Sequence, residues 1–173
     1  PAALAVDSAG NVYVTGESMS FMTPGFAPET QCEMMVGEPA PRRASQAACG
    51  PEFHASGATT TSDYATVKYD PNGNQLWVAR YAGLLGTGDW DEGATDLAVD
   101  SSGNFYVAGE TASLDLPVTN AVQATFGGGM WDAFLVKVAG DTLTPVFTTY
   151  FGGSGDDRAF VVIPNAIGQA SLA

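Results

Sequence analysis

A fourteen-residue pattern occurs twice in this chain and restricts the fold more than any other feature. The two copies span residues 4–17 (LAVDSAGNVYVTGE) and 97–110 (LAVDSSGNFYVAGE). Each has a short apolar run, an Asp-x-x-Gly-Asn turn and then a β-branched and aromatic run. This order predicts two strands joined by a tight turn, because an Asp carboxylate can accept turn N–H groups and Gly supplies a positive φ. We expect turn-forming roles for Asp7, Gly10, Asn11, Asp100, Gly103 and Asn104.

The similarity continues downstream of each copy, so the repeat is longer than one hairpin. Residues 63–69 match residues 132–138, and residues 76–81 match residues 145–150. These segments are rich in β-branched and aromatic residues, and turn-forming residues separate them. Each repeat therefore predicts four consecutive strands, and no segment has helical periodicity.

The repeats divide the chain into three parts. The expected boundaries are 1–93 for a first unit with a long insertion (18–61), 94–157 for a second unit and 158–173 for the start of a third. Four-stranded antiparallel units repeated along a chain are typical of β-propeller blades. A parallel β-helix is the alternative, but its coils are much shorter than these repeats. We therefore expect an all-β fold with two full blades and part of a third, as a piece of a larger propeller. The remaining blades would come from the same polypeptide or from other copies of the chain.

The charge composition argues against some classes of partner. Six Lys and Arg residues against 19 Asp and Glu give a formal net charge of −13. Such a charge disfavours binding to nucleic acids and to anionic lipid surfaces. The sequence has no run of 18 apolar residues, so we expect no membrane span.

Three motifs carry a family resemblance. They are the Ala-Val-Asp-Ser-x-Gly-Asn-x-Tyr-Val-x-Gly-Glu hairpin, the Asp-Ala-Phe-Leu-Val-Lys segment at 132–137 and the Thr-Thr-Tyr-Phe-Gly-Gly-Ser-Gly-Asp-Asp segment at 148–157. In these motifs the chain resembles the bacterial SBBP repeats, which form seven-bladed β-propellers of surface and secreted proteins. The resemblance covers nearly all of the chain except residues 18–61. It implies a propeller that is extracellular, periplasmic or at the cell surface, and it carries over no catalytic residues.

The insertion at 18–61 contains both cysteines and the only histidine. Long loops in compact domains are often functional, so this one is either a partner-binding loop or a passive addition. We expect Cys32 and Cys49 to form a disulfide, since they share one loop and the resemblance implies an oxidising compartment. A metal site of Cys32, Cys49 and His54 is the alternative, but it lacks a fourth ligand and a Cys-x-x-Cys spacing.

The connections between the units are acidic. Their carboxylates are Asp89, Asp91 and Glu92 before the second unit, and Asp156 and Asp157 before the third. Carboxylates in equivalent loops could give a calcium ion its hard oxygen ligands. The interpretation that we favour is that these side chains accept hydrogen bonds from backbone N–H groups between the units. Calcium is therefore the one cofactor that the sequence leaves open.

The sequence contains no recognisable catalytic constellation. His54 has no adjacent nucleophile motif, and residues 128–130 form a glycine run without the lysine of a phosphate-binding loop. We expect a non-catalytic scaffold, adhesion or protein-binding module that contacts a protein partner or surface ligand through residues 18–61. Two alternatives stay open. One is an accessory subunit of a larger envelope assembly, and the other is part of a propeller hydrolase or lyase whose active site lies mostly outside this stretch.

Overall fold

The computed structural model describes residues 1–21, 27–29, 60–81 and 92–173, and every regular element within these ranges is a β-strand. All the strand pairs are antiparallel. The predicted all-β class is confirmed for this part of the chain. The strands are β1 (Ala3–Val6), β2 (Val12–Phe21), β3 (Ala27–Glu29), β4 (Thr60–Tyr69), β5 (Gln75–Tyr81), β6 (Glu92–Val99), β7 (Phe105–Thr111), β8 (Asp132–Val138), β9 (Pro145–Phe151), β10 (Val162–Pro164) and β11 (Ala170–Leu172).

Two of the sheets have the same four-stranded core. The first sheet has the order β1-β2-β4-β5-β3, and the second has the order β6-β7-β8-β9. The repeated sequence segments therefore occupy the same places in both sheets, with each strand hydrogen-bonded to the next repeat strand along the chain. A third, two-stranded sheet is formed by β10 and β11, which we call the C-terminal hairpin.

The connection between the second and third repeat strands also contributes to each sheet, which the sequence did not predict. In the first sheet, β3 pairs with the outer edge of β5. In the second sheet, Thr119 forms an isolated bridge to Thr148 of β9. An uncovered edge strand leaves a row of N–H and C=O groups without partners, and a returning segment satisfies some of them. The fourth repeat strand is therefore not the last strand of the first sheet.

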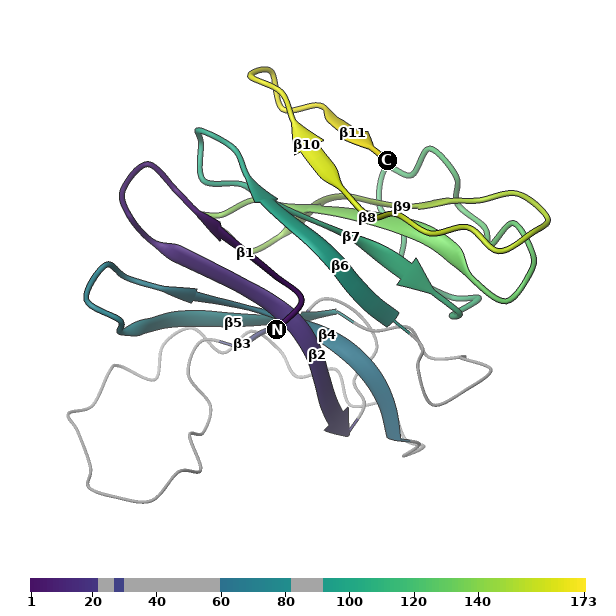
Figure 1. Ribbon diagram of the computed structural model, residues 1–173, viewed down its shortest axis with the longest axis horizontal. Helices are drawn as coiled ribbons and strands as arrows, with labels where there is room; N and C mark the ends of the chain where they lie inside the picture. The colour runs from purple at the N-terminus through teal and green to yellow at the C-terminus, as the bar shows by residue number, and fades with distance from the viewer. Residues whose placement is uncertain (22–26, 30–59, 82–91) are drawn as a thin grey trace.

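The second sheet lies between the first sheet and the C-terminal hairpin, so the three sheets spread like a fan (Figure 1). One cluster of buried residues joins the first and second sheets, and it includes Tyr13, Trp77 and Phe105. Another cluster joins the second sheet to the hairpin through Tyr106 and Val162. Within the described ranges, the fan is open and does not close into a ring.

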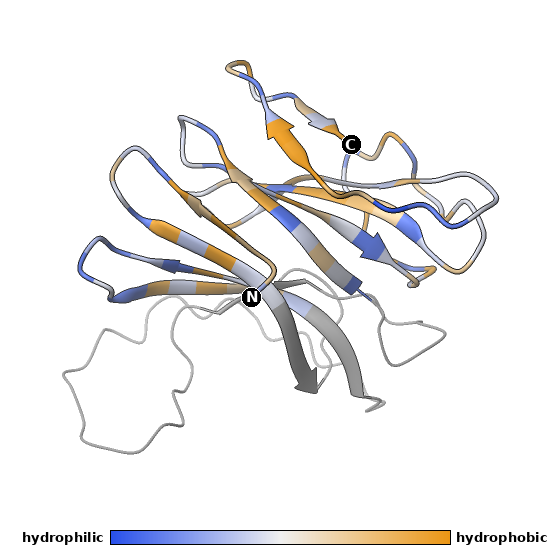
Figure 2. Cartoon of the chain, in the orientation of Figure 1, coloured by the Kyte–Doolittle hydropathy of each residue, from blue (hydrophilic) through white to orange (hydrophobic). Residues whose placement is uncertain are grey.

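Strand β8 takes part in both packing contacts, because its side chains alternate between the two faces of the sheet. All seven of its residues are buried. Phe134, Val136 and Val138 belong to the cluster shared with the first sheet, whereas Ala133 and Leu135 belong to the cluster shared with the hairpin. Since successive side chains point to opposite faces, β8 is apolar on both sides. The hydropathy colouring shows hydrophobic residues along this middle sheet (Figure 2). Among the described residues, no helix is long and apolar enough to cross a membrane.

Candidate functional site

The candidate site lies at four turns that close hairpins in the described part of the chain, and these four turns share one basic element. At each turn, one side-chain oxygen of the first residue accepts hydrogen bonds from the backbone N–H groups two and four residues ahead. The first residues are Asp7, Asp70, Asp100 and Asn165. The fourth residue is always a glycine with φ between 80° and 83°, a backbone conformation that costs glycine little. These are the contacts that an Asp-x-x-Gly-Asn spacing favours.

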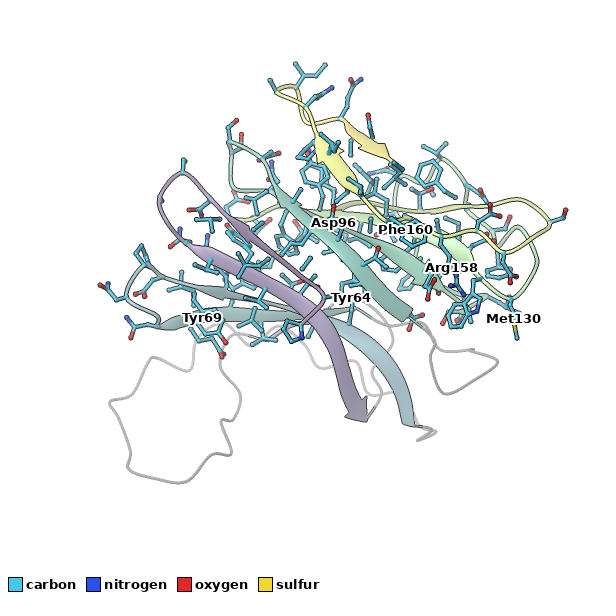
Figure 3. All side chains as sticks on the ribbon, viewed as in Figure 1. Tyr64, Tyr69, Asp96, Met130, Arg158 and Phe160 are labelled. Carbon is cyan, nitrogen blue, oxygen red and sulfur yellow. The ribbon has the colours of Figure 1, made fainter. Side chains whose placement is uncertain are left out.

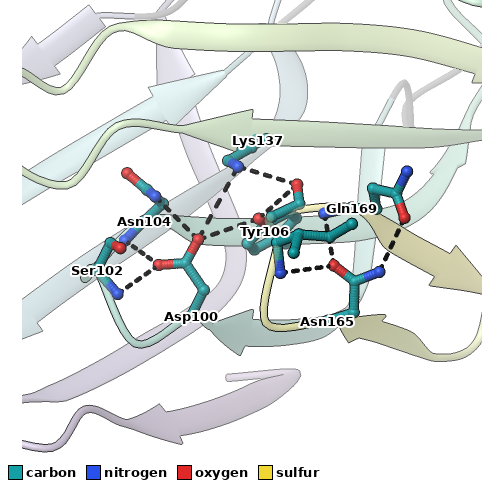
Figure 4. A network of polar contacts seen from close by, with 9 residues as sticks. Asp100, Ser102, Asn104, Tyr106, Lys137, Asn165 and Gln169 are labelled. Atoms are coloured by element: carbon teal, nitrogen blue, oxygen red, sulfur yellow. Dashed lines mark hydrogen bonds and ion pairs between the residues drawn. The ribbon is translucent and has the colours of Figure 1, made fainter.

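The turn of the C-terminal hairpin has the same geometry with different residues. In the three Asp turns, the Asn at the fifth position donates its Nδ2 to the second carboxylate oxygen, as Asn104 does to Asp100 at 2.8 Å. In the hairpin, Asn165 donates its own Nδ2 to Oε1 of Gln169 at 2.9 Å. The donor and acceptor exchange places, so the side-chain bridge survives the loss of the Asp. Figure 4 shows the Asp100 and Asn165 turns close to each other.

A tyrosine and a lysine complete the network on each of the first two sheets. On the second sheet, the Tyr106 hydroxyl lies 3.1 Å from Asp100 Oδ2. Lys137 Nζ lies 3.9 Å from the same oxygen and 5.0 Å from the centre of the Tyr106 ring. The first sheet repeats this arrangement with Asp7, Tyr13 and Lys68: the hydroxyl and Nζ lie 3.2 and 3.5 Å from Asp7 Oδ2, and Nζ lies 4.7 Å from the ring centre.

The network on the second sheet also holds the next unit. The Gly168 carbonyl, in the turn of the C-terminal hairpin, lies 3.0 Å from the Tyr106 hydroxyl and 3.0 Å from Lys137 Nζ. The phenol has a single proton, so the ammonium group secures this carbonyl whenever the tyrosine donates to Asp100. Two further hydrogen bonds join the units: Asp96 Oδ2 accepts the Val162 N–H at 2.7 Å, and the Thr95 hydroxyl donates to the Ala159 carbonyl. Asp96 is labelled where β6 faces the hairpin (Figure 3).

The ionisation of these groups follows from their surroundings. Burial acts to raise the pKa of Asp100, but the hydrogen bonds from Asn104, Ser102 and Tyr106 outweigh it and hold the pKa below its ordinary value. The pKa of Asp7 is lowered in the same way. Burial and the adjacent Asp100 raise the pKa of the Tyr106 hydroxyl far above its ordinary value. At neutral pH the network therefore consists of an ionised carboxylate and a neutral phenol, which suits a structural contact better than proton transfer.

The acidic residues proposed as calcium ligands are distributed differently. Asp89 and Asp91 lie outside the described residues. Glu92 is buried, and the Thr111 hydroxyl donates to its Oε1 at 3.3 Å. Asp156 accepts the Met130 N–H at 2.6 Å, and Asp157 accepts the Gly153 N–H at 2.8 Å. In the part of the chain that the structure describes, no three His, Cys, Asp or Glu side chains are grouped so that they could hold a metal ion.

The structure also has a buried carboxylate, Asp132, that the sequence did not single out. Asp132, at the start of β8, accepts the Gly127 N–H at 2.6 Å and lies 3.3 Å from Gln123 Nε2. Burial raises the pKa of Asp132, and the negative charge of Asp157 adds to this effect although the Gly127 N–H opposes it. This side chain ties the long connection before β8 to the sheet.

A hollow of about 300 Å³ lies where the N-terminus meets β6 and β7. Its lining residues are Pro1, Ala2, Gly93, Ala94, Thr95 and Glu110. Arg158 Nε forms an ion pair of 2.7 Å with Glu110 Oε2, and the guanidinium lies 6.0 Å from the centre of the Trp131 ring. The Glu110 carboxylate that lines this hollow is therefore paired with a neighbouring cation.

Most of the insertion lies outside the residues that the structure describes. Cys32, Cys49 and His54 lie outside the described residues, and the disulfide between the two cysteines stays a prediction. The Tyr106, Lys137 and Gly168 contacts were missed by the sequence reasoning. Their signal was present, since a Tyr follows the turn Asn by two residues in both hairpin copies and a Val-Lys pair recurs in both third strands.

No family model matches the chain. Among curated proteins, the chain is similar to a protein named Regulatory protein FlaEY from Caulobacter vibrioides (strain ATCC 19089 / CIP 103742 / CB 15), with 34% identity over 113 residues. The similarity covers 64% of this chain and 11% of that protein, so the chain spans only about a tenth of the relative's length.

Proposed function

We propose that this chain is part of a β-propeller of the SBBP repeat type and serves as a non-catalytic scaffold or protein-binding module. The observation that carries the proposal is the serial packing of the units. Two sheets with the same four-stranded core stack face to face, and the C-terminal hairpin stacks on the second sheet in the same sense. Propeller blades pack on one another in this manner around a central channel. Further units would come from the same polypeptide or from other copies of the chain.

The chemistry of the turns supports a structural role for the repeat residues. Tyr106 and Lys137 contact Asp100 within their own sheet and the Gly168 carbonyl of the neighbouring unit. These contacts do not activate any of the three groups as a nucleophile. We place the binding function in the long insertion, residues 18–61, and the protein outside the cytoplasm or at the cell surface, as the SBBP resemblance implies. Asp156 and Asp157 serve backbone contacts in this proposal, since each accepts a backbone N–H group. Calcium binding is the alternative that the sequence leaves open, and titration calorimetry with calcium alone tests it.

A regulatory role is the second candidate, and the similarity to the protein named Regulatory protein FlaEY favours it. In this role the chain would act as an accessory part of an assembly. Both candidates predict contacts to another protein and no turnover of a small substrate.

The test uses the product of the complete gene, in its own cells. Cross-linking with mass spectrometry should find contacts from residues 18–61 to a protein partner, and a variant with this segment shortened should lose them. The same purified product should show no turnover in panels for hydrolases and lyases. Turnover that disappears when a carboxylate of the chain is substituted would overturn the non-catalytic proposal.

A further inference from the structure

A buried carboxylate at the start of β8 joins two connections of the second unit to the sheet. The Oδ2 atom of Asp132 accepts the Gly127 N–H at 2.6 Å and lies 3.3 Å from Gln123 Nε2. Both partners belong to the β7–β8 connection (residues 112–131). Gln123 in turn accepts the Gly152 N–H through its Oε1 at 3.0 Å, at the start of the connection that follows β9. Asp132 and Gln123 therefore hold both connections.

The Asp132 carboxylate is closed off from water. The residue has no exposed surface. A Cβ at position 152 would overlap with the carboxylate, so the backbone of Gly152 lies directly against it. The second carboxylate oxygen, Oδ1, is buried and has no hydrogen-bond partner among the described residues. A buried anion with an unpaired oxygen is costly, and a neutral carboxyl group costs much less.

Among the described side chains, no cation offsets this cost. The described Lys and Arg side chains form ion pairs with other carboxylates, in the pairs Lys68–Asp7, Lys137–Asp100 and Arg158–Glu110. The charge that acts on Asp132 is the negative charge of Asp157, which accepts the Gly153 N–H at 2.8 Å. Burial and nearby carboxylates raise the pKa of Tyr150 in β9 to about 12, so this phenol is neutral. The remaining charged groups around this cluster are Glu92, Asp115 and Asp156.

We propose that Asp132 is a proton-dependent latch, whose neutral form holds the β7–β8 connection and the connection after β9 against the second sheet and whose ionised form loosens them. Two further contacts join the same connections and would loosen together with the latch. The Met130 N–H donates to Asp156 at 2.6 Å, and the Asp157 N–H donates to the Trp131 carbonyl at 2.7 Å. Met130 is labelled at this end of the second sheet (Figure 3). The latch makes the side of the unit from which both connections leave responsive to acidification.

The direction of the response follows from the pKa of Asp132. Burial raises this pKa above its ordinary value, the Gly127 N–H opposes the rise and the charge of Asp157 adds to it. The stability that the neutral form contributes is fully present below the unfolded pKa of about 3.9. It is lost as the pH rises through the folded pKa. The Asp100 turn has the opposite sign because, against the effect of burial, hydrogen bonds lower the pKa of that carboxylate.

Hydrogen exchange measured by mass spectrometry on the product of the complete gene tests the latch. Peptides that cover residues 123–131 and 152–157 report on the two connections, and a peptide that covers the Asp100 turn is the internal reference. Protection factors, in which the intrinsic effect of pH on exchange is removed, are compared between about pH 4 and about pH 8, above the ordinary pKa of an Asp side chain. The two connections should be severalfold better protected in acid, whereas the reference should gain no protection.

Three variants separate the latch from a contact that does not depend on protonation. Asp132→Asn keeps an oxygen for the Gly127 N–H but cannot ionise, so its protection should be the same at both ends of the pH range. Asp157→Asn removes the neighbouring negative charge and should respond less than the wild type. Asp156→Asn is the matched control and should respond like the wild type, since Asp156 is exposed and also accepts an N–H of the connection.

Two results would overturn the latch. One is a wild type whose connections are equally protected across the pH range, and the other is an Asp132→Asn variant that responds like the wild type. If Asp132→Asn does not fold, Asp157→Asn carries the test, and an unchanged response in that variant contradicts the inference. None of these results affects the cross-linking and turnover tests of the proposed function.

Discussion

The first and second sheets have the same four-stranded core and nearly the same hairpin sequence, but the same repeat position differs in burial between them. Leu97 is buried with 4% of its surface exposed, whereas Leu4 is 61% exposed. Neither the strand propensity nor the turn chemistry distinguishes the two leucines. The difference comes from the neighbour, because the first sheet covers Leu97 and nothing among the described residues covers Leu4. In a stack of repeats, the burial of a residue therefore depends on whether a neighbouring unit covers it, and not only on its position in the repeat.

The largest expected effect tests this comparison directly. Leu97→Ala should lower the free energy of unfolding by about 2–5 kcal/mol, as large-to-small substitutions in a core do. Leu4→Ala should change it by less than about 0.5 kcal/mol in the monomer, as exposed substitutions do. Urea unfolding at a low protein concentration measures both. Equal losses for the two variants would contradict the assigned packing.

The predicted disulfide would add stability to the first unit alone. Reduction of a Cys32–Cys49 bond should cost about 3 kcal/mol in the loop-entropy model. The measurement is intact mass after alkylation of freshly purified protein, with and without reductant, followed by unfolding of both forms. If both thiols alkylate without reductant, the pairing is wrong.

The tyrosines sharpen the comparison between the sheets. Tyr106→Phe should cost about 1.5–3 kcal/mol, because the hydroxyl contacts a charged carboxylate and the Gly168 carbonyl of the next unit. Tyr13→Phe should cost less, since its hydroxyl contact is with Asp7 of its own unit. Hydrogen exchange provides the second readout. The Val162 amide should exchange faster in Tyr106→Phe than in Tyr13→Phe, and equal rates would remove the proposed link between the units.

The smallest effect concerns the turn carboxylates. Asp100→Ala should cost about 1 kcal/mol, as the loss of a side chain that caps backbone N–H groups does, and should leave partner binding unchanged. The lowered pKa of Asp100 adds a pH dependence. Its stabilising contribution is present above the unfolded pKa of about 3.9 and is lost as the pH falls through the folded pKa. Asp100→Asn should therefore show a flatter loss of stability in acid than the wild type, and an identical acid profile would contradict the assignment.

The features that could be predicted from the sequence are local. The Asp-x-x-Gly-Asn spacing predicts the hydrogen bonds of the turns, because donor and acceptor lie within four residues of each other. The alternation in residues 132–138 predicts a strand. The contact of Tyr106 and Lys137 with Gly168 depends instead on how two units stack, and one sequence does not specify that geometry. Strand β3 was missed because it has three residues and its partner β5 lies far along the chain.

The turn at Asn165 shows a different limit. Without the Asp and Asn of the other copies, its sequence gives a weaker turn signal. The structure has the same turn, because an amide oxygen accepts the two backbone N–H groups as a carboxylate does and Gln169 completes the bridge. A pattern defined by hydrogen-bonding capacity would have found this turn where a pattern defined by residue type does not.

A double-mutant cycle tests the central claim, that the repeat units pack on one another face to face. Trp77 of the first sheet and Phe105 of the second sheet stack with 5.1 Å between their ring centroids. Trp77→Ala, Phe105→Ala and the double variant are unfolded in urea, and we predict an interaction energy of about 0.5–3 kcal/mol between the two positions. Losses that add to within about 0.3–0.5 kcal/mol would contradict the packing.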